Sequence, residues 1–278
     1  SILISSKDDL SLCDEDTGDI YFQLPNSFQN KLTEYLDLFR KNSKLIPWFP
    51  SVIIGEDYNV AVKFLSELNP TKIVSNNTGI AYEASKKGIA WIAGPQLNLT
   101  NSYSLLCLKE ELNCSGAFIS NELNKNQIKQ IKCPENFQLH YSIYHPIVLM
   151  TSRQCLFHQV TGCEKNRVDA TCIQNCDKAS SITNLKEDTF FIEKSKGNYH
   201  HVYNASNFLN TAILKDIPDT FSSFFIDMRD IKTETNIEFD KSKLIKLFKR
   251  MIDGNADSEQ ELHRLIDSTT CVQYQRGI

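Results

Sequence analysis

Four of the nine cysteines in this 278-residue chain fall within one polar segment of 22 residues. They are Cys155, Cys163, Cys172 and Cys176. Thiolates spaced so closely can share a zinc ion or an iron–sulfur cluster, and the spacing alone does not choose between the two metals. Buried structural cysteines and reactive thiols are the competing interpretations. We favour a metal centre, because Asn, Asp, Glu and Gln side chains stand between the sulfurs.

Several basic and imidazole side chains stand close to these cysteines in the sequence. Arg153 can offset the negative charge of clustered thiolates, and His145 and His158 can act as ligands or as acid–base groups. We therefore take Arg153, His145 and His158 as candidate catalytic residues, with hydrogen-bonded structural histidines as the alternative. His200 and His201 are neighbours on a predicted strand, so their side chains should point to opposite faces.

The elements that must position these residues alternate regularly over the first 150 residues. Apolar runs predict strands at residues 2–4, 19–24, 48–54, 72–75, 90–93, 117–120 and 138–144. Apolar stripes predict helices at residues 28–39, 60–68, 78–87, 102–112 and 122–131. Strand–helix units repeating every 20–25 residues or so favour a parallel β/α barrel or barrel-like sheet. A doubly wound open sheet is the alternative.

The pattern changes after the cysteine segment. Alternation at period two predicts a small antiparallel insertion with strands at residues 181–185, 189–193 and 199–203. A buried strand at 224–227 and an amphipathic helix at 244–252 follow. We therefore expect four regions: barrel-like strands and helices at 1–150, a Cys-rich metal-binding segment at 151–180, the antiparallel insertion at 181–210, and the closing strand with the C-terminal helix at 211–278.

Polar residues mark the carboxyl ends of the predicted strands, where β/α barrels carry out their chemistry. The candidate cofactor-binding residues at these ends are Asn77, Asn98, Asn101 and Glu122. Their alternative role is to cap the helices that follow, because Asn is a favoured residue at helix N-termini. No Gly-rich dinucleotide or P-loop motif occurs, so neither of these common nucleotide sites is expected.

Composition narrows the class of protein further. Thirty Lys and Arg residues against 34 Asp and Glu residues give a net charge of −4. This balance argues against a surface built wholly for polyanions, although it allows a local basic patch. No run approaches the roughly 18 apolar residues of a membrane-spanning helix, so we expect no membrane contact. The odd number of cysteines favours a reducing, cytoplasmic environment.

The stretch from Leu139 to Cys176 resembles the bacterial collagenase-like peptidase family U32. The similarity rests on the strand that ends at Tyr144 and His145, on Arg153 and Gln154 before the first cysteine, and on the cysteines that follow. Weaker similarities lie at Asn77–Ala81, Leu97–Ser102, Ser120–Leu123 and Gln275–Ile278. The chain departs from the family at Tyr144–Ile147, where members have a Gly-Ala/Ser-x-Cys stretch.

The resemblance implies a barrel-like fold with a [4Fe–4S] cluster bound by the four clustered cysteines. It implies oxygen-independent hydroxylation of an RNA base, either a ribosomal RNA cytidine or a transfer RNA uridine, and in some relatives a prephenate-derived cofactor. It also implies that this chain is the C-terminal unit of a longer member, with the N-terminal unit and ribosomal or transfer RNA as partners. A collagenase-like peptidase and a non-catalytic zinc-stabilised interaction module stay open as alternatives.

Overall fold

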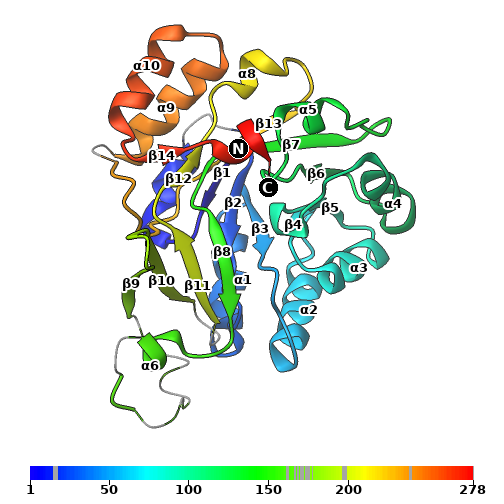
Figure 1. Cartoon of the computed structure of the whole chain (residues 1–278). Coiled ribbons are helices and arrows are strands. Elements are labelled where there is room, and N and C mark those ends of the chain that lie inside the picture. The colour runs from blue at the N-terminus through cyan, green and yellow to red at the C-terminus, as the bar shows by residue number, and fades with distance from the viewer. Residues whose placement is uncertain are drawn as a thin grey trace.

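Eight parallel strands close into a barrel in the computed structural model, which describes residues 1–14, 18–160, 163–165, 167, 169, 172, 176, 178–195, 199–237 and 240–277. Seven of the strands pair in chain order: β1 (Ile2–Ile4), β2 (Ile20–Gln23), β3 (Leu45–Phe49), β4 (Lys72–Ser75), β5 (Ala90–Ala93), β6 (Gly116–Phe118) and β7 (Gln138–His145). The strand β13 (Ser223–Asp227) pairs with both β7 and β1 and completes the ring. The predicted β/α barrel is confirmed, and the open doubly wound sheet is wrong (Figure 1).

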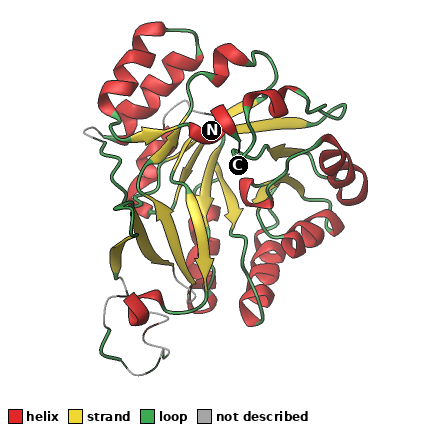
Figure 2. Ribbon diagram, viewed as in Figure 1, coloured by secondary structure: helices red, strands yellow, loops and turns green. Residues whose placement is uncertain are grey.

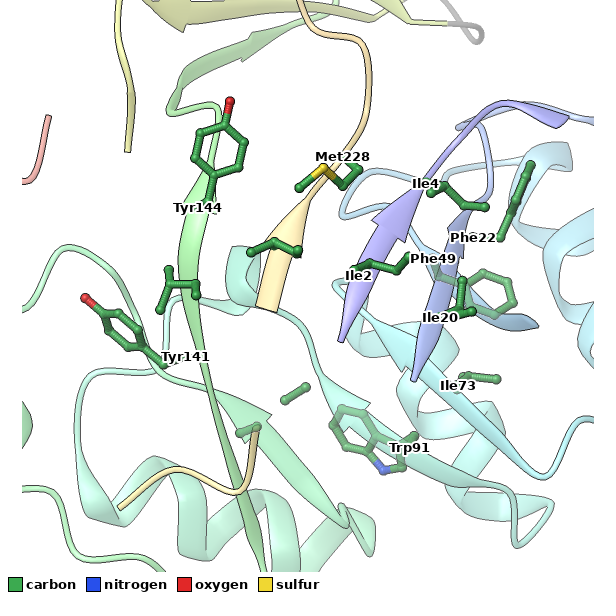
Figure 3. Packing of buried hydrophobic residues seen from close by; sticks show 14 of the residues in the cluster. Ile2, Ile4, Ile20, Phe22, Phe49, Ile73, Trp91, Tyr141, Tyr144 and Met228 are labelled. Carbon is green, nitrogen blue, oxygen red and sulfur yellow. The ribbon is translucent and has the colours of Figure 1, made fainter. Parts of the chain in front are cut away.

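Helices connect the strands and surround the barrel (Figure 2). The helices that follow β2 to β6 are α1 (Leu32–Lys41), α2 (Glu56–Leu68), α3 (Thr78–Lys86), α4 (Ser102–Leu112) and α5 (Lys125–Lys129), and β13 is followed by α9 (Lys241–Ile252) and α10 (Ala256–Leu265). Short 3-10 helices occur at η1 (Lys7–Asp14), η2 (Gln29–Lys31) and η3 (Pro95–Leu97). Outward-facing strand residues such as Ile2, Phe22 and Trp91 form the main core with these helices (Figure 3).

The inside of the barrel is filled by large side chains. Successive residues of a strand point to opposite faces, so the residues between the outward-facing ones point inward. These inward residues form a second buried cluster: Leu3, Tyr21, Trp48, Val74, Ile92, Phe118 and Phe225. The rings of Trp48 and Phe225 stack with centroids 5.3 Å apart and an interplanar angle of 14°. The barrel is therefore a packed core rather than an open channel.

A second, four-stranded antiparallel sheet has the order β8-β11-β10-β9. Its strands are β8 (Val148–Ser152), β9 (Ala179–Thr183), β10 (Thr189–Ser195) and β11 (Tyr199–Asn204). The predicted antiparallel insertion is confirmed, and β8 is an additional strand that the sequence pattern did not predict. The short helix α6 (Leu156–Val160) packs on this sheet through Phe157, which contacts Ile192 and Val202. The cysteine segment therefore leaves the sheet after β8 and returns to it at β9.

The remaining elements extend the barrel sheet at β7. The strand β12 (Asn207–Leu209) pairs antiparallel with β7, and β14 (Thr269–Thr270) pairs parallel with β12. Two short helices, α8 (Ile213–Asp216) and α11 (Val272–Arg276), complete the described chain. Within the ranges that the structure describes, no helix combines the length and the apolar character needed to cross a membrane.

Candidate functional site

A cavity of about 560 Å³ opens at the carboxyl ends of the barrel strands. Its floor is the top of the aromatic barrel interior, to which Trp48 and Phe225 contribute. One wall is Ile147–Thr151, which is mostly β8 of the antiparallel sheet. This is the end of the fold at which β/α barrels carry their active sites, and the volume suits a small molecule.

Arg229 is held at this cavity by two side chains from strand ends. Its Nε lies 2.8 Å from Oδ1 of Asp227, and its Nη2 and Nη1 donate at 2.5 Å to Asp227 Oδ2 and Gln23 Oε1. Burial would lower the pKa of Arg229, but the charge of Asp227 outweighs burial and raises it above its ordinary value. Asp227 and Arg229 therefore form a buried ion pair whose opposite charges offset each other.

The antiparallel sheet presents a row of polar side chains to Arg229. Thr151, His201 and Glu193 lie directly opposite one another on three neighbouring strands, and Thr151 Oγ1 is 3.0 Å from Nδ1 of His201. Burial lowers the pKa of His201 to about 4, and nearby Arg229 adds to the effect. Burial also raises the pKa of Glu193. The row therefore holds an imidazole that is neutral at pH 7 and a carboxyl group whose pKa lies above its ordinary value.

The two adjacent histidines face opposite sides of this sheet, as predicted. His201 contacts Thr151 on the side of the barrel mouth, whereas the ring of His200 packs 5.1 Å from that of Phe157. His200 is fully buried, and burial lowers its pKa to about 4.

Three of the candidates predicted from the sequence line the cavity. His145, at the end of β7, tilts its ring against Phe208 at 4.9 Å, and burial lowers the pKa of His145 to about 4. Asn98 and Glu122 also line the cavity, and Asn98 Nδ2 donates to Glu122 Oε2 at 3.1 Å. His145 is therefore a neutral imidazole at pH 7, whereas Asn98 and Glu122 form a polar contact of their own.

The other four candidates lie outside the cavity lining. Asn77 and Asn101 cap α3 and α4, because their side-chain oxygens accept from the N–H groups of the third residue beyond them. Arg153 is exposed, with its guanidinium 6.0 Å from the ring centre of Tyr199, and His158 is exposed on α6. The structure thus brings His145, Asn98 and Glu122 to one site and separates the other candidates from it.

Several cavity residues have no obvious sequence motif. Gln23, Ser142, Asp227, Arg229 and Gln273 all line the cavity, although they lie far apart in the chain. Two of them could have been identified from their position in the sequence, because Asp227 and Arg229 stand at the carboxyl end of the strand that closes the barrel.

A close backbone approach fixes the loop after β5, which carries Gln96 and Asn98 to the cavity. The buried Asn76 side chain donates to the Phe49 carbonyl at 3.0 Å and accepts from the Gln96 N–H at 2.9 Å. A Cβ atom on Gly94 would lie 2.2 Å from Asn76 Oδ1. Only glycine therefore fits at position 94 while Asn76 keeps these two hydrogen bonds.

The four clustered cysteines are half-buried free thiols. A hydrogen bond from the Lys165 backbone lowers the pKa of Cys163, and the Lys178 charge adds to the effect. Their number and chemical type fit a four-thiolate centre. In the part of the chain that the structure describes, however, no three His, Cys, Asp or Glu side chains lie close enough together to hold a metal ion. The assignment of these cysteines as metal ligands stays a prediction.

Comparison with known protein families identifies the chain. The family described as Peptidase family U32 matches residues 55–275, from the residue before α2 to α11. The match includes the cysteine segment, β8 and most of the strand ends that form the cavity. No curated protein and no solved structure matches the chain. Because the match spans most of its length, the chain belongs to peptidase family U32.

Proposed function

We propose that this chain is the iron–sulfur unit of an enzyme that hydroxylates an RNA base. The observation that carries the proposal is the continuity between the cavity and the cysteine segment. The wall strand β8 ends at Ser152, and Cys155 follows only three residues later. The small sheet that borders the cavity would therefore also carry the metal centre.

Cys155, Cys163, Cys172 and Cys176 would hold the cluster. When bound, a [4Fe–4S] cluster supplies one-electron transfer. Lys165 and Lys178, which act on Cys163, would offset part of the negative charge of the thiolates. Zinc bound by the same thiols is the alternative, and it would make the segment structural rather than redox-active.

The cavity residues of this chain would bind and orient the base. Trp48 and Phe225, which stack on each other, line the cavity with aromatic rings against which a flat ring would pack. Arg229, held by Asp227 and Gln23, offers fixed N–H groups, and β8 shields one side from water. The cavity volume suits a nucleoside-sized group turned out of an RNA strand, with ribosomal or transfer RNA as the partner. Contacts to the RNA backbone would be local or come from an N-terminal unit of the same chain.

The proposal is tested on RNA from cells that lack the gene and receive wild-type or variant protein. Wild type and the control Cys107→Ala, which changes an exposed thiol on α4, should restore the hydroxylated base in mass spectra of total RNA. Cys172→Ala should not restore it. Full restoration by Cys172→Ala would contradict a role for the cysteine centre in the reaction.

A peptidase is the second candidate, and one contact at the cavity wall favours it. Thr151 Oγ1 lies within hydrogen-bond reach of a neutral imidazole, that of His201, which is the arrangement of an activated hydroxyl nucleophile. Homogeneous protein incubated with denatured collagen and casein distinguishes the two candidates. Cleavage that is lost in Thr151→Ala would establish the peptidase, whereas the absence of cleavage is expected for the RNA enzyme.

A further inference from the structure

Three buried polar atoms that line the cavity have no hydrogen-bond partner among the described residues. They are Ser142 Oγ and His145 Nδ1 from β7 and Gln273 Oε1 from α11. Ser142 is 1% exposed, and no hydrogen bond within the described residues compensates for the burial of its hydroxyl. Buried polar side chains in native proteins nearly always have a partner. Three unpartnered atoms at one cavity therefore point to a ligand that supplies the missing partners.

The chemistry of these atoms restricts what that ligand offers. The Gln273 oxygen can only accept a hydrogen bond, whereas the Ser142 hydroxyl and the His145 ring nitrogen can donate or accept. A matching ligand therefore presents at least one N–H or O–H donor together with acceptor atoms. Carbonyl and ring-nitrogen edges of heterocycles have this composition.

The charge of the cavity restricts the ligand further. In the described lining, the buried charges are those of Arg229 and Asp227, and these two side chains neutralise each other. His145 is neutral at pH 7 because burial lowers its pKa to about 4. A buried anion without an unpaired cation is strongly disfavoured. The floor is therefore suited to an uncharged ligand and unsuited to a carboxylated one.

The shape of the floor favours a flat ligand. Trp48 and Phe225, which stack nearly parallel on each other, line the cavity together with the Phe208 ring, which lies against His145. Aromatic surfaces bind planar rings by stacking, largely independently of the substituents of the ring.

We propose that Ser142, His145 and Gln273 form a recognition site for the edge of an uncharged, planar heterocycle of the nucleobase type. The inference rests on the proposed function, which identifies the heterocycle as an RNA base. It adds which residues of the cavity bind the edge of that base. It also predicts that a small carboxylated cofactor does not occupy this floor.

The test is a titration of the full chain with uracil, cytosine and orotate, which is uracil carrying a carboxylate. Because Trp48 lines the cavity, its fluorescence reports binding there. At least one neutral base should bind, and orotate should bind roughly tenfold or more weakly than uracil, because its charge enters a floor with no free cation.

Two variants connect this binding to the unpartnered atoms. Ser142→Ala should weaken the binding of the neutral base by roughly five- to tenfold, as expected for a lost hydrogen bond. Its thermal unfolding midpoint should be no lower than that of wild type, because the removed hydroxyl has no partner in the folded protein. The matched control, Ser66→Ala, changes a hydroxyl that donates to Val62 O on α2 and should leave binding unchanged.

Three results would overturn the inference: no binding of either neutral base, tighter binding of orotate than of uracil, or wild-type affinity in Ser142→Ala. The inference and the proposed function can fail separately. Base binding that depends on Ser142, in a protein that leaves cellular RNA unmodified, would contradict the proposed function alone. RNA hydroxylation that is insensitive to Ser142→Ala would contradict the recognition site alone.

Discussion

At the scale of single residues, Arg229 joins the two parts of the site. It donates to Asp227 and Gln23 on the barrel, and its charge opposes the rise that burial causes in the pKa of Tyr203 on the antiparallel sheet. Asp227 is 4% exposed, so the pair lies in a region where an unmatched charge is costly. The ion pair therefore leaves the cavity floor without net charge and places the Arg229 guanidinium close to the antiparallel sheet.

Asp227→Ala should lower the free energy of unfolding by about 3–5 kcal/mol, because it leaves the Arg229 guanidinium buried without its carboxylate. Asp230→Ala is the control, since Asp230 is 76% exposed in its ion pair with Lys241 and its loss should cost less than about 1 kcal/mol. Urea denaturation followed by circular dichroism measures both. Equal losses in the two variants would show that burial does not govern the Asp227 pair.

The residue type of the polar side chains at the strand ends does not by itself distinguish cavity residues from helix caps. Asn77, Asn98 and Asn101 all follow predicted strands, yet Asn98 lines the cavity while the other two cap helices. An asparagine that caps a helix and an asparagine that faces a ligand both occur between the end of a strand and the start of the next helix. The difference comes from the backbone, because Asn98 ends a 3-10 turn in the left-handed conformation and so points elsewhere.

At the scale of elements, strong periodicity made helices and buried strands predictable. The predictions for β4, β5 and α4 match the structure to the residue, since each is bounded by turn residues and contains a clear apolar pattern. β3 begins three residues before the prediction, because Pro47 lies inside it and proline normally marks the edge of a strand. α10 escaped prediction, because its buried residues are only Ser258 and Leu262.

Phe248 tests how the last predicted helix, α9, holds the barrel. Its side chain is 1% exposed, and its ring lies 5.9 Å from that of Tyr144 on β7. Phe248→Ala should cost about 3–5 kcal/mol of unfolding free energy, since it leaves a cavity between helix and barrel. Ile252→Ala on the same helix should cost less than about 1 kcal/mol, because Ile252 is 39% exposed. A comparable loss in both variants would contradict this packing of α9.

At the scale of the whole molecule, barrel closure forms a site from residues that lie far apart in the sequence. The fold class was predictable because the strand–helix rhythm persists through β7. The cavity was not, because Gln23 and Gln273 come together only when β13 joins β1 to β7. Closure and the packing of the second sheet also bury His140 and His200 and half-bury His145 and His201, and desolvation lowers the pKa of each to about 4.

These histidines should make the protein sensitive to acid. Their pKa is near 6.5 in the unfolded chain and about 4 in the fold, so the unfolded state binds more protons between these values. The histidines therefore do not reduce the free energy of unfolding above pH 6.5, and this free energy should decrease as the pH falls from 6.5 toward 4. His200→Phe should reduce the dependence of unfolding free energy on pH in this window, because it removes a fully buried imidazole whose ring nitrogens have no hydrogen-bond partner among the described residues.

The matched control for this prediction is His158→Gln, which replaces an exposed histidine on α6. Urea denaturation at pH 7, 6, 5 and 4.5 gives the slope for each protein. A slope for His200→Phe equal to that of wild type and of His158→Gln would contradict the contribution assigned to His200.

The iron and acid-labile sulfide content of anaerobically purified protein tests whether the four clustered cysteines bind an iron–sulfur cluster. We expect roughly four iron and four sulfide per chain, lost in Cys155→Ala and retained in Cys133→Ala, which changes a thiol outside the clustered segment. One zinc without sulfide, with unfolding on chelation, would instead establish the zinc-stabilised module. That result, or protein free of both metals, would contradict the iron–sulfur assignment.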